Sequence, residues 1–171
     1  MSGRRDPPPR GEGVLHALGA YSIWGVLPVY WKWLSALPAP AILAHRIVWS
    51  LLFSALLLTV TRRWRDLRAV LAGRSTLVPL VASASLIGGN WLVFIWAVNH
   101  DRVLETSLGY YLTPLANVAL GRAFLAERLS GLQLAAVGLA GAGVLQQAVV
   151  LDAPPWIALF LATTFALYGL V

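Results

Sequence analysis

The sequence predicts an all-α membrane protein, built as a polytopic bundle of transmembrane helices. Of its 171 residues, 58% are hydrophobic and 12% are charged, whereas a soluble domain usually carries about 25% charged residues. So few charges could not cover the surface of a soluble core, but a bilayer is itself an apolar solvent. The eight tryptophans and five tyrosines suit the membrane–water interface, where an apolar ring with a polar edge is stable.

Six apolar stretches are candidates for spanning helices, each of which needs about 20 mostly apolar residues. They lie at 13–31, 39–60, 77–98, 104–125 and 129–150, and the sixth begins at 155 and is still apolar at 171. The connections are short, so neighbouring helices should form antiparallel hairpins. A soluble helical bundle would need six consecutive helices of membrane length that carry almost no charge, which makes it the weaker interpretation.

The basic residues alternate from one side of these spans to the other. The first tail and the even-numbered connections hold ten of them: Arg4, Arg5, Arg10, Arg62, Arg63, Arg65, Arg68, Arg74, Arg122 and Arg128. The odd-numbered connections hold only Lys32 and Arg102. Because basic loops stay inside, we expect residues 1–12 to form a cytoplasmic tail. The net charge of +6 then reflects topology and does not indicate a nucleic-acid partner.

A short pattern recurs in the first and the sixth span. Residues 21–25 read YSIWG and residues 165–169 read FALYG, so both contain aromatic-x-x-aromatic-Gly. Five spans separate the two copies, and a duplicated unit with an odd number of spans inserts in opposite orientations. We therefore expect one five-helix repeat at 13–150 and the first helix of a second, inverted repeat at 155–171. The complete protein would then have roughly 290 residues.

Four stretches carry a resemblance to a known family. They are GVLHALGAYSIWG at 13–25, AHRIVWS at 44–50, SLIGGNWLVFIWAVN at 85–99, and LETSLGYYLTPLANVALGRAFLAERL at 104–129. The last contains a proline, a glycine and a glutamate (Pro114, Gly121 and Glu127) in the order typical of EamA repeats. The sequence resembles the RarD group of EamA-type transporters, within the drug/metabolite transporter superfamily. The resemblance implies ten helices in two inverted five-helix repeats, a central substrate cavity and a bacterial inner membrane.

Polar residues within spans are costly and are functional candidates by default. Arg46, beside His45, lies roughly 9 Å below the outer surface at 1.5 Å per residue, where it either binds solute or snorkels to the interface. Asn90 needs hydrogen-bond partners in a dry medium, either from a solute or from a packed helix. Glu105 opens the fourth span; it either pairs with Arg46 or faces the helix dipole.

A stripe of polar and small residues follows one face of the fourth span. Its members recur at intervals of 4, 3, 4 and 4: Thr106, Tyr110, Thr113, Asn117 and Gly121. Pro114 adjoins the stripe and frees a backbone carbonyl there. This face predicts the lining of a wet cavity, with interhelical packing as the alternative.

The resemblance and the predicted inverted repeat imply a transporter, which we expect to export a small metabolite or drug-like molecule by alternating access. The alternatives are a non-transporting structural or assembly subunit and a truncated, inactive fragment. An enzyme is disfavoured because the sequence shows no nucleophile–base pair, phosphate-binding loop or paired-histidine metal motif, and no cofactor is expected. The expected partners are a small-molecule substrate and the lipid bilayer, with a second copy of the chain or the missing second repeat beside it.

Overall fold

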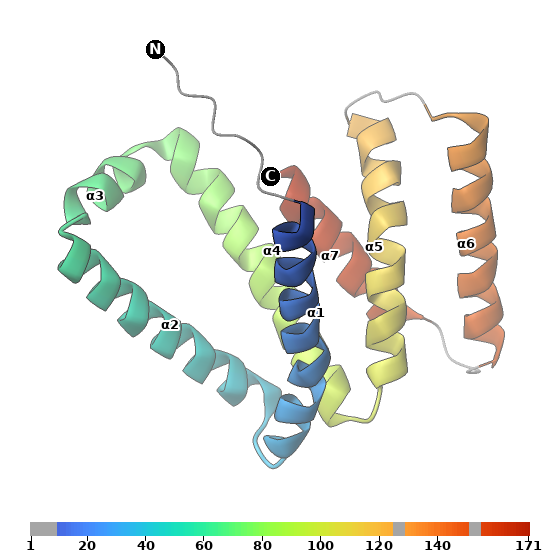
Figure 1. The fold of residues 1–171 in the computed structure, drawn as a ribbon, viewed down its shortest axis with the longest axis horizontal. Helices are drawn as coiled ribbons and strands as arrows, with labels where there is room; N and C mark the ends of the chain where they lie inside the picture. The colour runs from blue at the N-terminus through green and yellow to red at the C-terminus, as the bar shows by residue number, and fades with distance from the viewer. Residues whose placement is uncertain (1–9, 125–128, 151–154) are drawn as a thin grey trace.

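The computed structural model describes residues 10–124, 129–150 and 155–171, and the regular elements in these ranges are all α-helices. They are α1 (Arg10–Trp33), α2 (Ala39–Thr61), α3 (Trp64–Ala72), α4 (Arg74–Asn99), α5 (Val103–Phe124), α6 (Gly131–Val150) and α7 (Trp156–Leu170) (Figure 1). The all-α prediction is therefore confirmed. Six of the helices match the six predicted spans to within a few residues at each end. Glu127, which belongs to the family-like pattern, and most of the tail at 1–12 lie outside the described residues.

Three of the described helices are long and apolar enough to cross a membrane: Gly13–Trp33 within α1, then α2, then α4. The helices α5 and α6 have 22 and 20 residues, which corresponds to about 30 Å at 1.5 Å per residue. The last helix, α7, is apolar but has only 15 residues. That α5, α6 and α7 also span the membrane remains a prediction.

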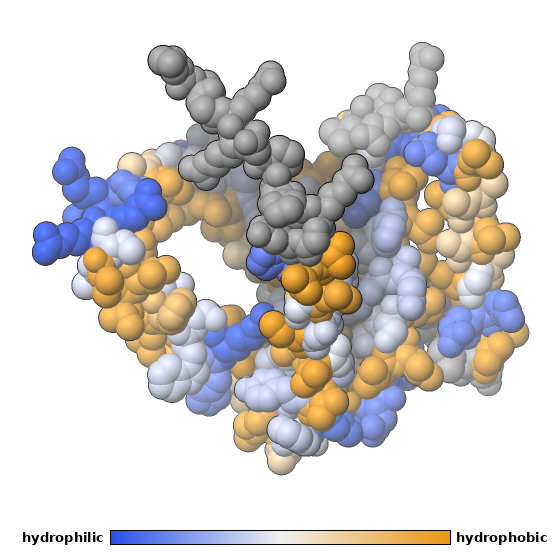
Figure 2. Space-filling model, in the orientation of Figure 1, coloured by the Kyte–Doolittle hydropathy of each residue, from blue (hydrophilic) through white to orange (hydrophobic). Residues whose placement is uncertain are grey.

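Much of the apolar side-chain surface faces outward, as a protein in lipid requires. Large apolar residues along α2 are more than half exposed, among them Trp49, Phe53 and Leu56. Figure 2 shows apolar side chains over α2 and a hydrophilic group at its far end, over α3. In water such a surface would drive aggregation, so the distribution supports the membrane assignment.

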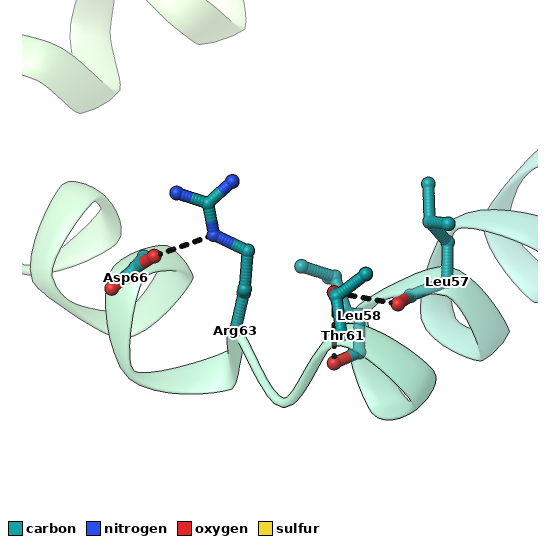
Figure 3. A network of polar contacts seen from close by, with 5 residues as sticks. All are labelled: Leu57, Leu58, Thr61, Arg63 and Asp66. Atoms are coloured by element: carbon teal, nitrogen blue, oxygen red, sulfur yellow. Dashed lines mark hydrogen bonds and ion pairs between the residues drawn. The ribbon is translucent and has the colours of Figure 1, made fainter.

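The turn that leads from α2 into α3 is held by side-chain contacts, which Figure 3 shows, and by backbone hydrogen bonds. Arg62 has a φ of 54°, and the N–H groups of Arg62 and Arg63 donate to the carbonyls of Thr59 and Leu58, which is a Schellman ending. Arg63 Nε lies 3.0 Å from Asp66 Oδ2. This turn changes the direction of the chain, and α3 begins within the basic connection (Figure 1).

The helix α3 was not predicted from the sequence, because its nine residues are too few for a span. At 100° per residue, Trp64, Leu67 and Leu71 lie within an arc of about 60° on α3, and Arg65 lies on another side. Arg68 borders the apolar arc next to Trp64. Such a helix suits the plane of a membrane interface, with its basic face toward the headgroups. The apolar periodicity is visible in the sequence, within the basic connection between the second and third predicted spans.

The core forms where α7 packs against α4 and α5 (Figure 1). Ile95, Val98 and Ile157 are fully buried there. Gly109 of α5 allows the closest approach, because a Cβ atom at this position would lie 3.0 Å from Leu161 Cβ and 3.2 Å from the carbonyl oxygen of Ala158. In contrast, α6 lies at the edge of the molecule beside α5 (Figure 1), and most of its described side chains are exposed.

The helices alternate in direction along the bundle. The start of α1, the helix α3 and the end of α5 lie at one end of the molecule (Figure 1). These elements carry or adjoin the described basic residues assigned to the cytoplasmic side. The helices α1 and α7 run in opposite directions (Figure 1), as the two halves of an inverted repeat would. The repeat itself, its boundaries at 13–150 and 155–171, and the cytoplasmic location of the tail remain predictions.

Candidate functional site

A pocket of about 570 Å³ lies where α1, α2 and α4 meet, and we call it the Arg46 pocket. Its lining comprises Leu27, Tyr30, Trp31, Leu34, Leu37, Ile42, His45, Arg46, Trp49, Ser50 and Trp91. The lining is mostly aromatic and aliphatic, with few polar groups, and its volume falls within the range of about 300–1,000 Å³ that is usual for small-molecule sites. The pocket therefore has the size and the wall chemistry of a ligand site.

Arg46 is the cationic centre of this pocket. Its guanidinium carbon lies 3.5 Å from the ring centroid of Trp91 on α4 and 5.8 Å from that of Trp31 on α1. Contact with an aromatic face stabilises a cation, and more strongly where water is excluded. These contacts hold the half-buried Arg46 side chain among the helices rather than leave it free.

Two hydrogen-bond donors beside this pocket lack a partner within the described part of the chain. They are Nη1 of Arg46 and Nε1 of Trp31. Both atoms are buried, and Trp31 as a whole is only 5% exposed. Native proteins pair most of their buried polar groups, so these two atoms are unsatisfied donors of residues that line the pocket.

A chain of aromatic rings joins the Arg46 pocket to α5. The ring centroids of Trp91 and Phe94 are 5.6 Å apart, and those of Phe94 and Tyr110 are 5.9 Å apart. Trp24 of α1 closes the cluster, at 5.7 Å from Trp91 and 6.5 Å from Tyr110. The structure thus brings Arg46 and Tyr110, two predicted site residues, to the same aromatic cluster.

Asn90 faces α7 and not the Arg46 pocket. Its side-chain nitrogen donates to the carbonyl of Leu161 at 2.9 Å and to the hydroxyl of Thr164 at 2.8 Å. The side chain is 3% exposed. These contacts correspond to the packing alternative for Asn90, in which an amide ties two helices together.

Glu105 forms an ion pair with Arg102, next to the start of α5. Its Oε1 lies 3.3 Å from Nε of Arg102, and the Arg102 guanidinium carbon lies 5.9 Å from the ring centroid of Trp96. No ion pair between Glu105 and Arg46 occurs among the contacts of the described residues. Arg102 and Arg46 therefore both lie near a tryptophan, but the described structure pairs only Arg102 with a carboxylate.

The residues of the polar stripe of α5 lie in different surroundings. Thr106 is 2% exposed, and its hydroxyl donates to the Val103 carbonyl at 2.7 Å, while Thr113 donates to the Gly109 carbonyl at 3.0 Å. Asn117 lines a second pocket of about 380 Å³ between α5 and α7; its other lining residues are Val118, Leu120, Gly121, Ala166, Gly169 and Leu170. Pro114 lies inside α5 and is exposed. A solute path along the stripe remains a prediction.

The aromatic walls of the Arg46 pocket were not predicted from the sequence. Tryptophans are common at membrane interfaces, and composition alone does not separate those from tryptophans that line a pocket. Trp91, which lines the pocket, lies well inside α4, away from the helix ends where interface anchors occur. That position within the span was the available signal.

The EamA-like transporter family matches residues 11–147 of this chain. Protein RarD of Escherichia coli is 49% identical over 160 residues, which cover 94% of this chain and 54% of that protein. An uncharacterized transporter of Bacillus subtilis, YojE, is 46% identical over 163 residues, with 93% and 54% covered. A chloramphenicol-sensitive protein RarD of Pseudomonas aeruginosa is 41% identical over 164 residues, with 92% and 54% covered. No solved structure gives a significant match.

The chain spans about half the length of these curated relatives. The family match covers most of the chain and includes the helices that form the Arg46 pocket. The relatives are named RarD or transporter, as the resemblance of the four sequence stretches implied. The chain therefore belongs to the EamA-like transporter family, in its RarD group.

Proposed function

We propose that the full-length protein exports a small metabolite or drug-like molecule across the bacterial inner membrane by alternating access. The observation that carries this proposal is the Arg46 guanidinium, which lies 3.5 Å from the Trp91 ring centroid beside a pocket of about 570 Å³. An arginine inside a span is costly to keep, and residues of this kind mark substrate pathways in transporters. The family and the names of the relatives support transport rather than enzymatic catalysis.

In this proposal the helices of 13–150 act as one half of a carrier. The second half would be an inverted repeat that begins with α7 and supplies the opposite wall of the site. Alternating access then consists of rocking one repeat against the other around a fixed site near the membrane midplane. The opposite directions of α1 and α7 (Figure 1) fit such an arrangement.

Membrane vesicles of defined orientation test this proposal, because export appears as uptake into inside-out vesicles. The full-length protein is expressed in a strain that lacks its own RarD-type proteins. Energised inside-out vesicles are then assayed with radiolabelled solutes, starting with chloramphenicol, since one relative is named chloramphenicol-sensitive. The panel continues with amino acids and small aromatic acids.

We expect at least one solute to accumulate above the level of vesicles that lack the protein. Right-side-out vesicles preloaded with the same solute should lose it faster when the protein is present. Folded protein at normal abundance that moves no solute of the panel in either vesicle type would count against transport. Faster uptake into right-side-out vesicles only would contradict the export direction.

A further inference from the structure

We infer that the Arg46 pocket binds a small organic monoanion, namely a carboxylate on a planar apolar body, with Arg46 and Trp31 as its hydrogen-bond donors. This inference rests on the proposed transport function and names the substrate class for the same site. It comes from the two donors without partners, from the geometry of the guanidinium and from the walls of the pocket.

The two donor atoms of Arg46 and Trp31 need a hydrogen-bond acceptor, and their chemistry limits what that acceptor can be. Arginine and the tryptophan indole can donate hydrogen bonds but cannot accept them. Nη1 of Arg46 and Nε1 of Trp31 are buried and have no acceptor within the described residues, and both residues line the same pocket. A group that satisfies both must therefore carry acceptor oxygens, and an anionic group also matches the charge of Arg46.

A second constraint is the orientation of the guanidinium. Its contact with Trp91, at 3.5 Å from carbon to ring centroid, occupies one face of the planar group. The N–H groups lie in the plane and point away from its edge, so contact with the ring face leaves them free to bond. A carboxylate fits such an edge by two parallel hydrogen bonds.

Arg102 provides an internal comparison. It also lies near a tryptophan, at 5.9 Å from the Trp96 ring centroid, but its Nε is already 3.3 Å from a carboxylate oxygen of Glu105. The chain thus supplies a carboxylate to Arg102. No described residue supplies one to Arg46, and in this inference a bound molecule does so.

A third constraint concerns the body of the ligand and its charge. Four aromatic rings line the pocket: Tyr30, Trp31, Trp49 and Trp91. Flat apolar groups stack well on such rings. Among the lining residues Arg46 is the permanent cation and His45 the only other basic side chain, so a single negative charge is matched and a phosphate dianion is not.

In this conformation both donor atoms are out of contact with solvent. The anion therefore reaches them only when the surrounding side chains shift. Binding of this kind depends on the conformation of the protein, as a carrier that alternates between two states requires. Affinity measured on the full-length protein is the relevant quantity, because that protein samples both states.

Equilibrium binding to the purified full-length protein in detergent tests the inference without any need for transport. The probes are radiolabelled benzoate and benzamide, which have the same shape but differ in charge. We expect benzoate to bind at least about tenfold more tightly than benzamide. Arg46→Lys should remove most of that preference, because lysine keeps the charge but loses the planar donor edge.

Two further variants make the result specific. Arg102→Lys is the matched control, and it should bind benzoate like the parent because Arg102 is paired with Glu105. Trp31→Phe keeps an aromatic ring and removes the Nε1 donor, so it should weaken benzoate binding about threefold to tenfold and leave benzamide binding unchanged. If Arg46→Lys is not recovered folded, the benzoate affinity of Trp31→Phe tests the inference in its place.

Equal affinity for benzoate and benzamide in the parent would overturn the inference. So would parental benzoate affinity in Arg46→Lys, or in Trp31→Phe where the lysine variant does not fold. Flux of a neutral solute without preferential benzoate binding would support transport and contradict the binding of a monoanion in the Arg46 pocket. Preferential benzoate binding that depends on Arg46, in a protein that moves no solute, would support monoanion binding and contradict transport.

Discussion

The side-chain amide of Asn90 on α4 donates a 2.8 Å hydrogen bond to the hydroxyl of Thr164 on α7. The same nitrogen donates to the Leu161 carbonyl at 2.9 Å, and the Thr164 hydroxyl donates a hydrogen bond to the Phe160 carbonyl at 2.7 Å. Because Asn90 is 3% exposed, lipid and water cannot replace these partners. The network therefore fixes where α7 lies against α4.

We expect Asn90→Leu and Thr164→Val each to lower the free energy of unfolding by about 1 kcal/mol. Their effects should be coupled, because the two side chains share one hydrogen bond, and the double variant should lose less than the sum. Unfolding of the full-length protein in mixed micelles measures this. Thr113→Val is the control, since its hydroxyl bonds only to a carbonyl of its own helix. Strictly additive losses would show that the bond does not join the helices energetically.

Gly109 is predicted to be the least tolerant glycine at the α5–α7 contact. A Cβ atom there would lie 3.0 Å from Leu161 Cβ and 3.2 Å from the Ala158 carbonyl oxygen, and backbone atoms cannot move aside cheaply. Gly109→Ala should therefore destabilise the protein by about 1–3 kcal/mol, measured as above. Gly88→Ala is the matched control, because a Cβ atom there meets nothing within 4 Å in the described structure. Equal stability of the two variants would mean that α5 and α7 pack less closely than described.

Much of the fold could be predicted from the sequence because lipid imposes a simple rule on length and polarity. Six helices followed from six apolar stretches. The helix α3 did not, because its Arg65 and Arg68 masked an apolar face that is only nine residues long. The docking of α7 between α4 and α5 was also beyond the sequence, since it depends on Gly109 meeting Ala158 across two distant segments.

The topology is predicted from the placement of the basic residues, and the chain has no native cysteine that would interfere with a labelling test. We expect Ser75→Cys, at the start of α4 next to the basic connection, to react with an impermeant maleimide only after the cells are opened. Ser35→Cys, between α1 and α2, should react in intact cells. Labelling of the Ser75 variant in intact cells would reverse the orientation, and with it the assignment of the tail to the cytoplasm.

The candidate site was only partly within reach of sequence reasoning. Arg46 was identifiable because a charge in a span is rare. The tryptophans that it contacts could not be identified from the sequence. The pairing of Arg102 with Glu105 and the contact of Arg46 with Trp91 depend on how α2, α4 and α5 cross. Periodicity placed Thr106 and Thr113 on one face, but it could not show that their hydroxyls bond to their own helix.

The most direct test of the central claim is solute flux in proteoliposomes that contain the full-length protein, normalised to folded protein and measured with the solute that the parent moves fastest. If the Arg46 pocket is part of the transport path, Arg46→Lys should lower flux at least about tenfold, and Arg102→Lys should leave it near the parental rate. Parental flux in both Arg46→Lys and Asn117→Leu would contradict the account, and the Arg46 pocket and the α5 stripe would then be features of helix packing.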